Sequence, residues 1–242
     1  MSEMVQGEFT EDGKEILMTL PLTGVRKSIK KNLLESMQNT AQASSFIKPD
    51  LSKLIKYKEK LKSVNQSVSY TVFFMKSIAI ALQREPLLNS AIAGKKIQIY
   101  KSVNMGVATP GPKDLLFVPV IRNIQDKSLA EISAELKEKA QRAGEGNLQM
   151  DDITGGTFTV SSLGMYEICG MTPILNTPAS AIMGIGNIFK EPAVNENDEI
   201  VVRPTAYFSL TVDHQIINGV PVVRFFKALT DVLNEPEKYL IY

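Results

Sequence analysis

Apolar and polar side chains follow two successive periods near the C-terminal end of the chain. Residues 206–213 alternate between apolar and polar, which is the period of a β-strand with one buried face. Over residues 222–233 the apolar positions recur at spacings of three and four, which predicts an amphipathic helix. Pro221 suits the first turn of that helix, and Asn218 is placed to cap its N-terminus. His214 therefore stands in a turn between a strand and a helix.

The same periodicities predict helices and strands along the rest of the chain. Helices are expected over 21–37, 51–62, 69–84 and from a Ser128–Glu131 capping box onward. Strands are expected over 44–48, 96–100, 103–108, 115–121, 155–164 and 181–188. Pro119 favours a bulge or an edge position within one of these strands. Because helices and strands do not alternate regularly, we expect an α+β single domain whose mixed β-sheet is flanked by helices.

Two of the expected helices have contrasting faces. The helix over 69–84 is apolar almost all round, which predicts a buried position at the centre of the fold. The helix over 21–37 has one apolar stripe, and its lysines are expected to be solvated. Arg26 lies beside the stripe and is expected to be partly buried. Residues 1–17 are polar and read as a flexible arm or linker, so the expected domain spans 18–242.

Composition limits the class of protein. The 242 residues are 44% hydrophobic and 22% charged, as is typical of a globular protein with a sizeable core. A net charge of +1 gives no electrostatic case for nucleic acid or an anionic membrane. One histidine and one cysteine cannot build a zinc site of nitrogen and sulfur ligands, and no metal is expected. The start of the chain does not resemble a signal peptide, so the expected location is cytoplasmic.

The residues around His214 resemble a known active-site motif. His-x-x-x-Asn-Gly, formed by His214, Asn218 and Gly219, resembles the motif of the dihydrolipoamide acyltransferases, which are the core components of 2-oxoacid dehydrogenase complexes. Chloramphenicol acetyltransferase carries a similar motif. The commoner residue at the position of Asn218 is Asp, and some family members carry Asn. The resemblance continues in order through 24–27, 103–108, 118–122, 127–132, 155–165 and 172–176. It implies a chloramphenicol acetyltransferase-like fold.

The resemblance implies acyl transfer between the thiols of coenzyme A and dihydrolipoamide. His214 would be the general base, because imidazole side chains titrate near pH 7 whereas thiols are mostly protonated there. Ser161 matches the hydroxyl that stabilises the oxyanion, with Ser162 as the alternative. The amide of Asn218 cannot act as a base; it would hold the turn and hydrogen-bond near the site, and any contact with Arg26 would be a hydrogen bond and not an ion pair. Arg26 and Gly219 are assigned to structural support of the site.

The resemblance also implies partners. Family members form homotrimers in which the histidine of one chain meets the serine of its neighbour, and larger members stack trimers into cubic or dodecahedral cores. The expected partners are a lipoyl domain and the other subunits of a dehydrogenase complex. No lipoyl domain or subunit-binding domain precedes the core in this sequence, so the lipoyl group is expected on another domain or protein.

Three functions remain open at this point. The first is the acyltransferase core of a 2-oxoacid dehydrogenase complex, which the ordered motifs favour. The second is a free-standing trimeric acyltransferase that uses coenzyme A and another acceptor, and the missing lipoyl domain favours it. The third is a non-catalytic scaffold subunit, which the retention of His214 disfavours. The acyl group, whether acetyl, succinyl or branched, is also left open.

Overall fold

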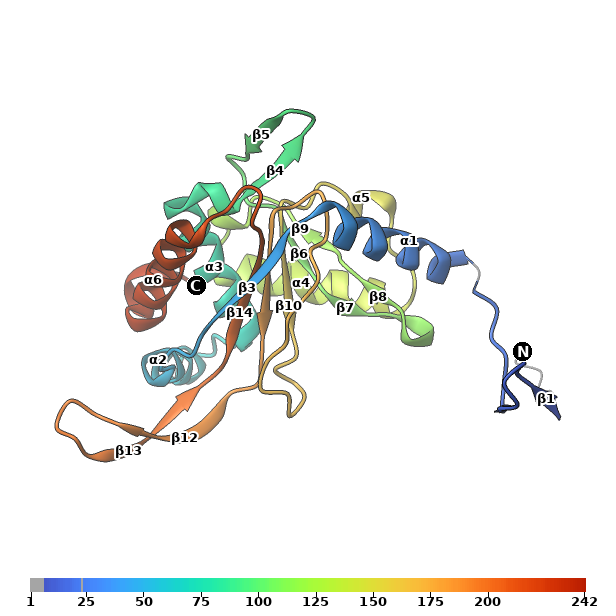
Figure 1. The fold of residues 1–242 in the computed structure, drawn as a ribbon. Helices are drawn as coiled ribbons and strands as arrows, with labels where there is room; N and C mark the ends of the chain where they lie inside the picture. Colours follow the sequence, from blue (N-terminus) through green and yellow to red (C-terminus); the bar gives the residue numbers. More distant parts are fainter. Residues whose placement is uncertain (1–6, 23) are drawn as a thin grey trace.

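A six-stranded mixed sheet forms the centre of the computed structural model, which describes residues 7–22 and 24–242 (Figure 1). Its strands run in the order β3 (Gln42–Ile47), β14 (Phe208–Asp213), β11 (Ala181–Ile185), β10 (Phe158–Ser162), β6 (Met105–Val107) and β9 (Val120–Ile121). β10 is parallel to β6 and β11, and the other pairs are antiparallel. The expected α+β fold with a mixed sheet is thereby confirmed.

Helices cover one face of this sheet. They are α2 (Ser52–Ser63), α3 (Tyr70–Arg84), α4 (Leu129–Gly144) and α6 (Gly219–Asn234), followed by the short α7 (Pro236–Tyr239). Ten of the fifteen residues of α3 are buried, which confirms its predicted central position. The ring of Phe74 on α3 meets the ring of Phe208 on β14 edge-on, with their centroids 5.0 Å apart. Close aromatic packing of this kind joins the helices to the sheet and forms the core.

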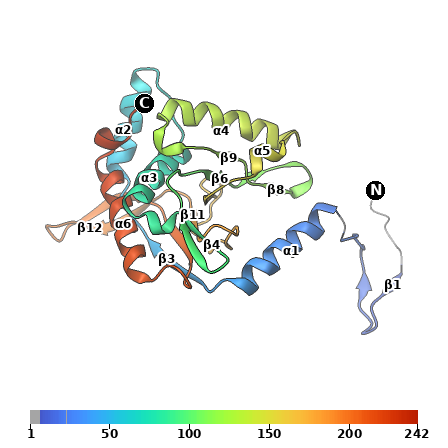
Figure 2. The same cartoon turned by 90° about the horizontal axis from the view of Figure 1, so that it is seen from above.

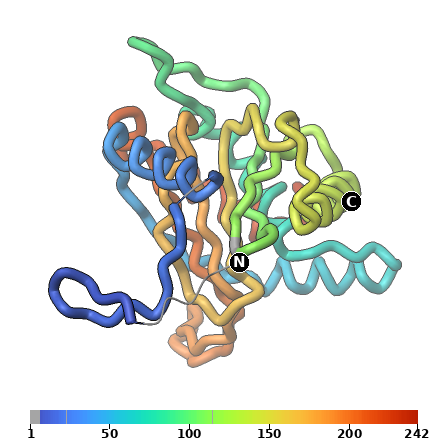
Figure 3. Tube along the Cα trace, turned by 90° about the vertical axis from the view of Figure 1, so that its right-hand side faces the viewer, coloured from blue at the N-terminus to red at the C-terminus, as the bar shows by residue number. Residues whose placement is uncertain are grey.

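Several hairpins project from this body. They are β1 (Glu8–Phe9) with β2 (Glu15–Ile16), β4 (Ser90–Ala93) with β5 (Lys96–Ile99), and β12 (Phe189–Val194) with β13 (Ile200–Thr205); Figures 1 and 3 show each of them extending outward. A smaller pair, β7 (Thr109–Pro110) and β8 (Leu116–Phe117), lies beside α4, and the short α5 (Met150–Ile153) follows that helix. The described part of the N-terminal arm is thus an exposed hairpin, and the domain boundary at residue 18 stays a prediction.

The first long helix, α1 (Gly24–Asn39), leaves the body of its own chain (Figures 1 and 2). Its predicted apolar stripe is exposed, with Val25, Leu33 and Met37 each 43–53% accessible. Ser36 is its one buried residue, and the Ser36 hydroxyl donates a hydrogen bond of 2.7 Å to the carbonyl of Leu175. The helix was predicted correctly, but nothing in the described part of the chain covers its stripe.

Two strand predictions need correction. The strand that precedes His214 is buried on both faces, not one, because its polar face is covered as well: Ser209 and Thr211 are 1% and 2% exposed. The Thr211 hydroxyl is satisfied there by Ser44 on β3, at 2.8 Å. The single strand expected over 115–121 is two short strands, β8 and β9, which Pro119 separates because proline cannot donate to a sheet.

None of the helices in the two described ranges is long and apolar enough to cross a membrane.

Candidate active site

The turn that follows β14 holds its backbone firmly and leaves the side chain of His214 open to solvent. The N–H of His214 donates a hydrogen bond of 2.8 Å to the carbonyl of Ala41. Within the turn, the N–H groups of Ile216 and Ile217 both donate to the carbonyl of Asp213, at 3.0 Å. His214 itself is exposed. An accessible imidazole on a firmly held backbone can come within hydrogen-bond reach of a bound substrate, as a general base must.

Asn218 occupies the N-cap position of α6, as predicted, with extended backbone angles. Its side chain makes no capping hydrogen bond, however, and it is exposed. A Cβ atom added at Gly219 would meet nothing within 4 Å. No steric contact described in this chain therefore requires glycine at that position.

Ser161 lies near the end of β10, and strand alternation places its side chain on the face of the sheet away from α3. Phe158 and Val160 belong to the core beneath the helices, so Thr159 and Ser161 project to the opposite side. Ser162 shares the side of Val160. This difference of face distinguishes the two candidate serines and favours Ser161 for any role on the helix-free face.

Strand register separates Ser161 from His214 within one chain. Ser161 is level with Gly184 on β11, which in turn is level with Ser209 on β14. His214 lies five residues beyond Ser209, about 17 Å along the strands, and β14 is two strands away from β10, about 10 Å across the sheet. Side chains of these sizes cannot meet over such a separation. The two predicted site residues are therefore not brought together by a single chain.

Arg26 is not buried within its own chain, and its role in supporting the site stays a prediction. Arg26 is exposed on α1 rather than partly buried. Among the described residues, no hydrogen bond or ion pair joins Arg26 to Asn218. The physical reason is that α1 extends away from the body, so its N-terminal half lies apart from the sheet and the helices that cover it (Figures 1 and 2).

One residue of this region was missed by reasoning from the sequence. Asp213 was counted as a polar position on the outer face of a strand, yet it is only 4% exposed. Its Oδ1 atom accepts hydrogen bonds from the N–H groups of Ala41 and Gln215, both at 3.1 Å. The available signal was an Asp at the end of a strand and the start of a turn, a position where its carboxylate commonly accepts from nearby N–H groups.

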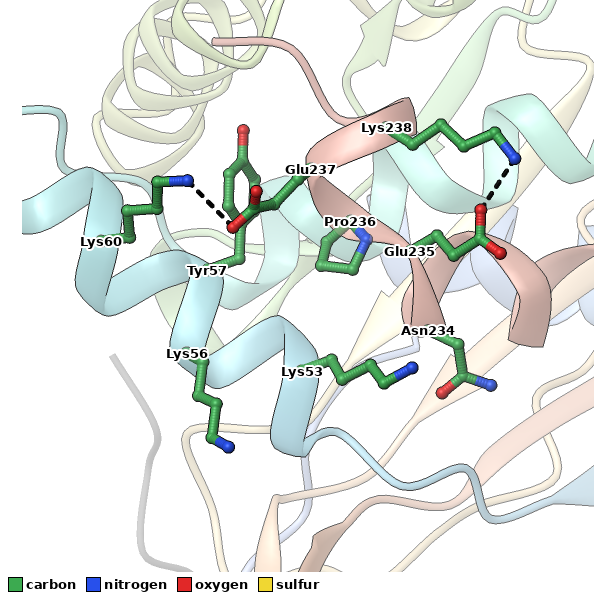
Figure 4. Close-up of a pocket in the computed structure, with 9 residues that line it drawn as sticks. All are labelled: Lys53, Lys56, Tyr57, Lys60, Asn234, Glu235, Pro236, Glu237 and Lys238. Atoms are coloured by element: carbon green, nitrogen blue, oxygen red, sulfur yellow. Dashed lines mark hydrogen bonds and ion pairs between the residues drawn. The ribbon is translucent and has the colours of Figure 1, made fainter.

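Two hollows lie elsewhere on the surface. One of about 530 Å³ lies between α2 and the junction of α6 with α7, and Figure 4 shows Lys53, Lys56, Tyr57 and Lys60 on α2 beside the residues of that junction. Within it Lys60 pairs with Glu237 at 3.1 Å. The other, of about 620 Å³, runs beside α1. Neither contains His214 or Ser161.

In the part of the chain that the structure describes, no group of three or more His, Cys, Asp or Glu side chains could hold a metal ion.

Comparison with known proteins identifies the family. Residues 15–241 match the family described as 2-oxoacid dehydrogenases acyltransferase (catalytic domain). This chain belongs to that family. Among curated relatives, the succinyltransferase component of the 2-oxoglutarate dehydrogenase complex of Azotobacter vinelandii is 32% identical over 235 residues, which cover 95% of this chain and 58% of the relative. The acetyltransferase component of the acetoin cleaving system of Bacillus subtilis is 34% identical, over 92% of this chain and 56% of the relative. The chain thus spans just over half the length of these acyltransferases.

Solved structures of the same family have the same fold. A dihydrolipoamide acetyltransferase of Azotobacter vinelandii superposes with a TM-score of 0.88 at 30% identity, and each chain is covered completely. That study concerned a serine, a histidine and an asparagine in the catalytic mechanism of the Azotobacter enzyme, and the asparagine lies four positions after the histidine. The cubic core of a pyruvate dehydrogenase complex gives the same TM-score and identity. Chloramphenicol acetyltransferase, at 14% identity and a TM-score of 0.57, shares the fold, as expected.

Proposed function

We propose that this chain is the catalytic core of an acyltransferase that moves an acyl group between dihydrolipoamide and coenzyme A. The observation that carries the proposal is His214, an exposed imidazole whose backbone is anchored to a strand buried on both faces. Family membership supports the same reaction. Asn218, four residues further, stands at the spacing of the histidine and asparagine named in the catalytic mechanism of the Azotobacter acetyltransferase, which supports a site with Asn in place of the commoner Asp.

In this proposal, His214 activates the attacking thiol. The imidazole accepts the proton of the S–H group, and the resulting thiolate attacks the carbonyl carbon of the acyl thioester. The tetrahedral intermediate then collapses, and its C–S bond to the original carrier breaks. The departing sulfur takes the proton back from the imidazolium, so that His214 ends the cycle neutral. The lipoyl group and coenzyme A enter as substrates, and no metal takes part.

Ser161 supplies the oxyanion donor, and a second copy of the chain is needed to bring it to His214. The separation fixed by strand register excludes the contact within one chain. Ser161 is half-buried on the side of the sheet away from α3, so part of its side chain is open to a neighbouring copy. A hydroxyl aimed at a developing oxyanion contributes about 3 kcal/mol to transition-state stabilisation in comparable sites.

We propose a homotrimer as the active unit, held within a larger core and supplied by a lipoyl domain of a dehydrogenase complex. Two observations support association: the apolar stripe of α1 is exposed, and the cubic pyruvate dehydrogenase core has the same fold. Neither of these two observations indicates which acyl group is transferred. The acyltransferase components of a 2-oxoglutarate dehydrogenase complex, an acetoin cleaving system and a branched-chain alpha-keto acid dehydrogenase complex are all 32–34% identical to this chain. The cytoplasmic location stays a prediction.

The decisive test is transfer from acetyl-, succinyl- or branched acyl-coenzyme A to free dihydrolipoamide, followed as thioester formation. Replacing His214 by Ala should lower kcat about 100-fold or more, because a positioned general base contributes roughly that much. Lys96→Ala, which shortens an exposed side chain on the β4–β5 hairpin, is the matched control and should transfer normally.

Other results would redirect the proposal. Unaltered transfer by His214→Ala in an intact assembly would exclude the base role. No transfer by the wild type with any of the three donors would contradict the thiol-to-thiol reaction and favour a scaffold or an acceptor other than dihydrolipoamide.

A further inference from the structure

A buried carboxylate lies directly before His214. Asp213 is 4% exposed, and its Oδ1 atom accepts hydrogen bonds from two backbone N–H groups, those of Ala41 and Gln215, both at 3.1 Å. A carboxylate at such a position is costly unless donors replace the lost water. The two N–H groups replace part of that hydration, so the side chain and the turn hold each other in place.

The backbone of Asp213 makes further contacts at the same point. Its N–H donates 2.9 Å to the carbonyl of Ser180, which directly precedes β11. Its carbonyl accepts the N–H groups of Ile216 and Ile217, which close the turn. One residue thus joins the approach to β11, the end of β14 and the turn that holds the imidazole.

Three hydrogen bonds attach this turn to the link between α1 and β3. His214 donates its N–H to Ala41 at 2.8 Å, and Ala41 donates its own N–H to Asp213. The side-chain Nε2 of Gln215 donates 2.8 Å to the carbonyl of Asn39, the last residue of α1. Only one of these three bonds has a carboxylate as its acceptor, the bond from Ala41 to Asp213. The same carboxylate oxygen also accepts the N–H of Gln215.

We propose that Asp213 is the positioning residue of His214. Its carboxylate fixes the turn against the α1–β3 link, so that the imidazole is presented in one orientation. The inference rests on the proposed function. Without the acceptor, two N–H groups lose their partner and the turn can shift, while β14 stays paired on both sides. A displacement of roughly 1 Å at a catalytic group can cost about 100-fold in rate. The effect should fall on kcat and spare the KM for coenzyme A.

The test compares two variants and a control in the assembled protein. Asp213→Ala removes the acceptor, whereas Asp213→Asn keeps an oxygen that can accept both N–H groups. Asp50→Ala is the matched control, because Asp50 also accepts a backbone N–H, that of Ser52 at 2.8 Å, but beyond the opposite end of β3. We expect kcat to fall about 30- to 100-fold in Asp213→Ala and to stay close to wild type in the other two. KM for acetyl-coenzyme A should not change.

Amide hydrogen exchange read by mass spectrometry gives a second readout that does not depend on activity. Peptides containing Ala41 and Gln215 should exchange faster in Asp213→Ala and at the wild-type rate in Asp213→Asn. If the wild type transfers no acyl group, the proposed function fails, and exchange alone decides whether Asp213 clamps the turn. If these peptides exchange at the wild-type rate in Asp213→Ala, the proposal that Asp213 holds the turn in place is wrong.

Three kinetic results would also overturn the inference. One is a wild-type kcat in Asp213→Ala. The second is an equal loss in Asp213→Ala and Asp213→Asn, because charge rather than acceptor geometry would then matter. The third is a loss of kcat accompanied by a matching rise in KM or by loss of assembly, which would indicate general damage. If Asp213→Ala does not fold, a large loss in Asp213→Asn alone still contradicts the proposal.

Discussion

Asn218 stands at the N-cap of α6, but its side chain makes no capping hydrogen bond in the described chain. Its contribution to folding should therefore be small, and any contribution to transfer must come from substrate or from a neighbouring copy. We expect Asn218→Ala to change the free energy of unfolding by less than about 0.5 kcal/mol, as at other exposed positions. Transfer should fall about tenfold or more, as when groups that orient a site are removed.

Asn218→Asp provides the matched comparison. A carboxylate at the start of α6 interacts favourably with the helix dipole, by about 0.5 kcal/mol. We expect a slightly raised Tm by thermal unfolding and retained transfer. A clear drop of Tm in Asn218→Ala would show that the side chain does cap the helix in solution and would contradict this account.

At the scale of residues, local sequence identified His214, Asn218 and Ser161 as candidates but could not identify Asp213. The reason is distance along the chain. The carboxylate of Asp213 is satisfied by Ala41, 172 positions away, and only the register of β3 against β14 brings the two together. The exposure of Arg26 was mispredicted for a related reason, since helical periodicity indicates which face is apolar but not what covers it.

Among the elements, the junction of α4 with α5 depends on one ionised carboxylate. Asp152, which is 7% exposed, accepts the N–H of Gln149 at 2.8 Å and pairs with Lys139 at 3.0 Å and with Arg142 at 2.5 Å. The Gln149 N–H is the largest cause that lowers the pKa of Asp152 from its ordinary 3.8; burial opposes it, and Lys139 and Arg142 add to the lowering.

Because this pKa is lowered in the folded state, the stabilisation is complete above pH 3.8 and is lost as the pH falls through the lowered pKa. At pH 7 we expect Asp152→Asn to cost about 2 kcal/mol in the free energy of unfolding. The cost should shrink progressively below pH 4. Denaturant unfolding at several pH values measures it, and Asp151→Asn, whose side chain is 92% exposed, is the control that should change little. If Asp152→Asn lowers the free energy of unfolding as much below pH 4 as at pH 7, the ionised carboxylate is not what stabilises this junction.

Periodicity predicted the long elements well and the short ones poorly. The apolar pattern of α3 was sufficient to place it in the core, although it contains Lys76. The structure accounts for this lysine, since its Nζ atom donates to the carbonyls of Gln125 and Lys127 at 2.7 and 2.6 Å. Burial lowers the pKa of Lys76. The apolar run over 115–121 was ambiguous because strand pattern alone does not show where Pro119 interrupts pairing.

At the scale of the whole molecule, the separation of Ser161 from His214 predicts complementation between copies. His214→Ala and Ser161→Ala chains should each be nearly inactive. If trimers form from an equal mixture, each site takes its histidine and serine from different chains. Random assembly around a threefold axis then restores about a quarter of the wild-type sites. Refolding or co-expressing the two variants together and measuring transfer tests this.

Recovered activity would be incompatible with a site built within one chain, because every chain in the mixture carries a lesion. No recovery, in a mixture shown by mass spectrometry to contain mixed trimers, would contradict the shared site.

The exposed stripe of α1 predicts a second property of the assembly. Leu33→Glu places a charge on a surface that makes few contacts within its own chain, so the sheet and its covering helices should still fold. Association should be lost, because a buried unpaired carboxylate is costly at an interface. Light scattering coupled to size exclusion should show single chains. Asn32→Glu adds the same charge beside the stripe and should leave the assembly intact; equal dissociation of both variants would implicate net charge instead.

The exposed stripe of α1 also affects what happens to a newly synthesised chain before it assembles. A newly synthesised chain can form its own β-sheet, because no strand of that sheet comes from another copy. Until it meets other copies, however, the apolar stripe of α1 stays exposed to water. Dilute, orphaned chains should therefore be the ones that chaperones retain and proteases remove. Overproduction of this protein should be limited less by its folding than by how quickly its copies find one another.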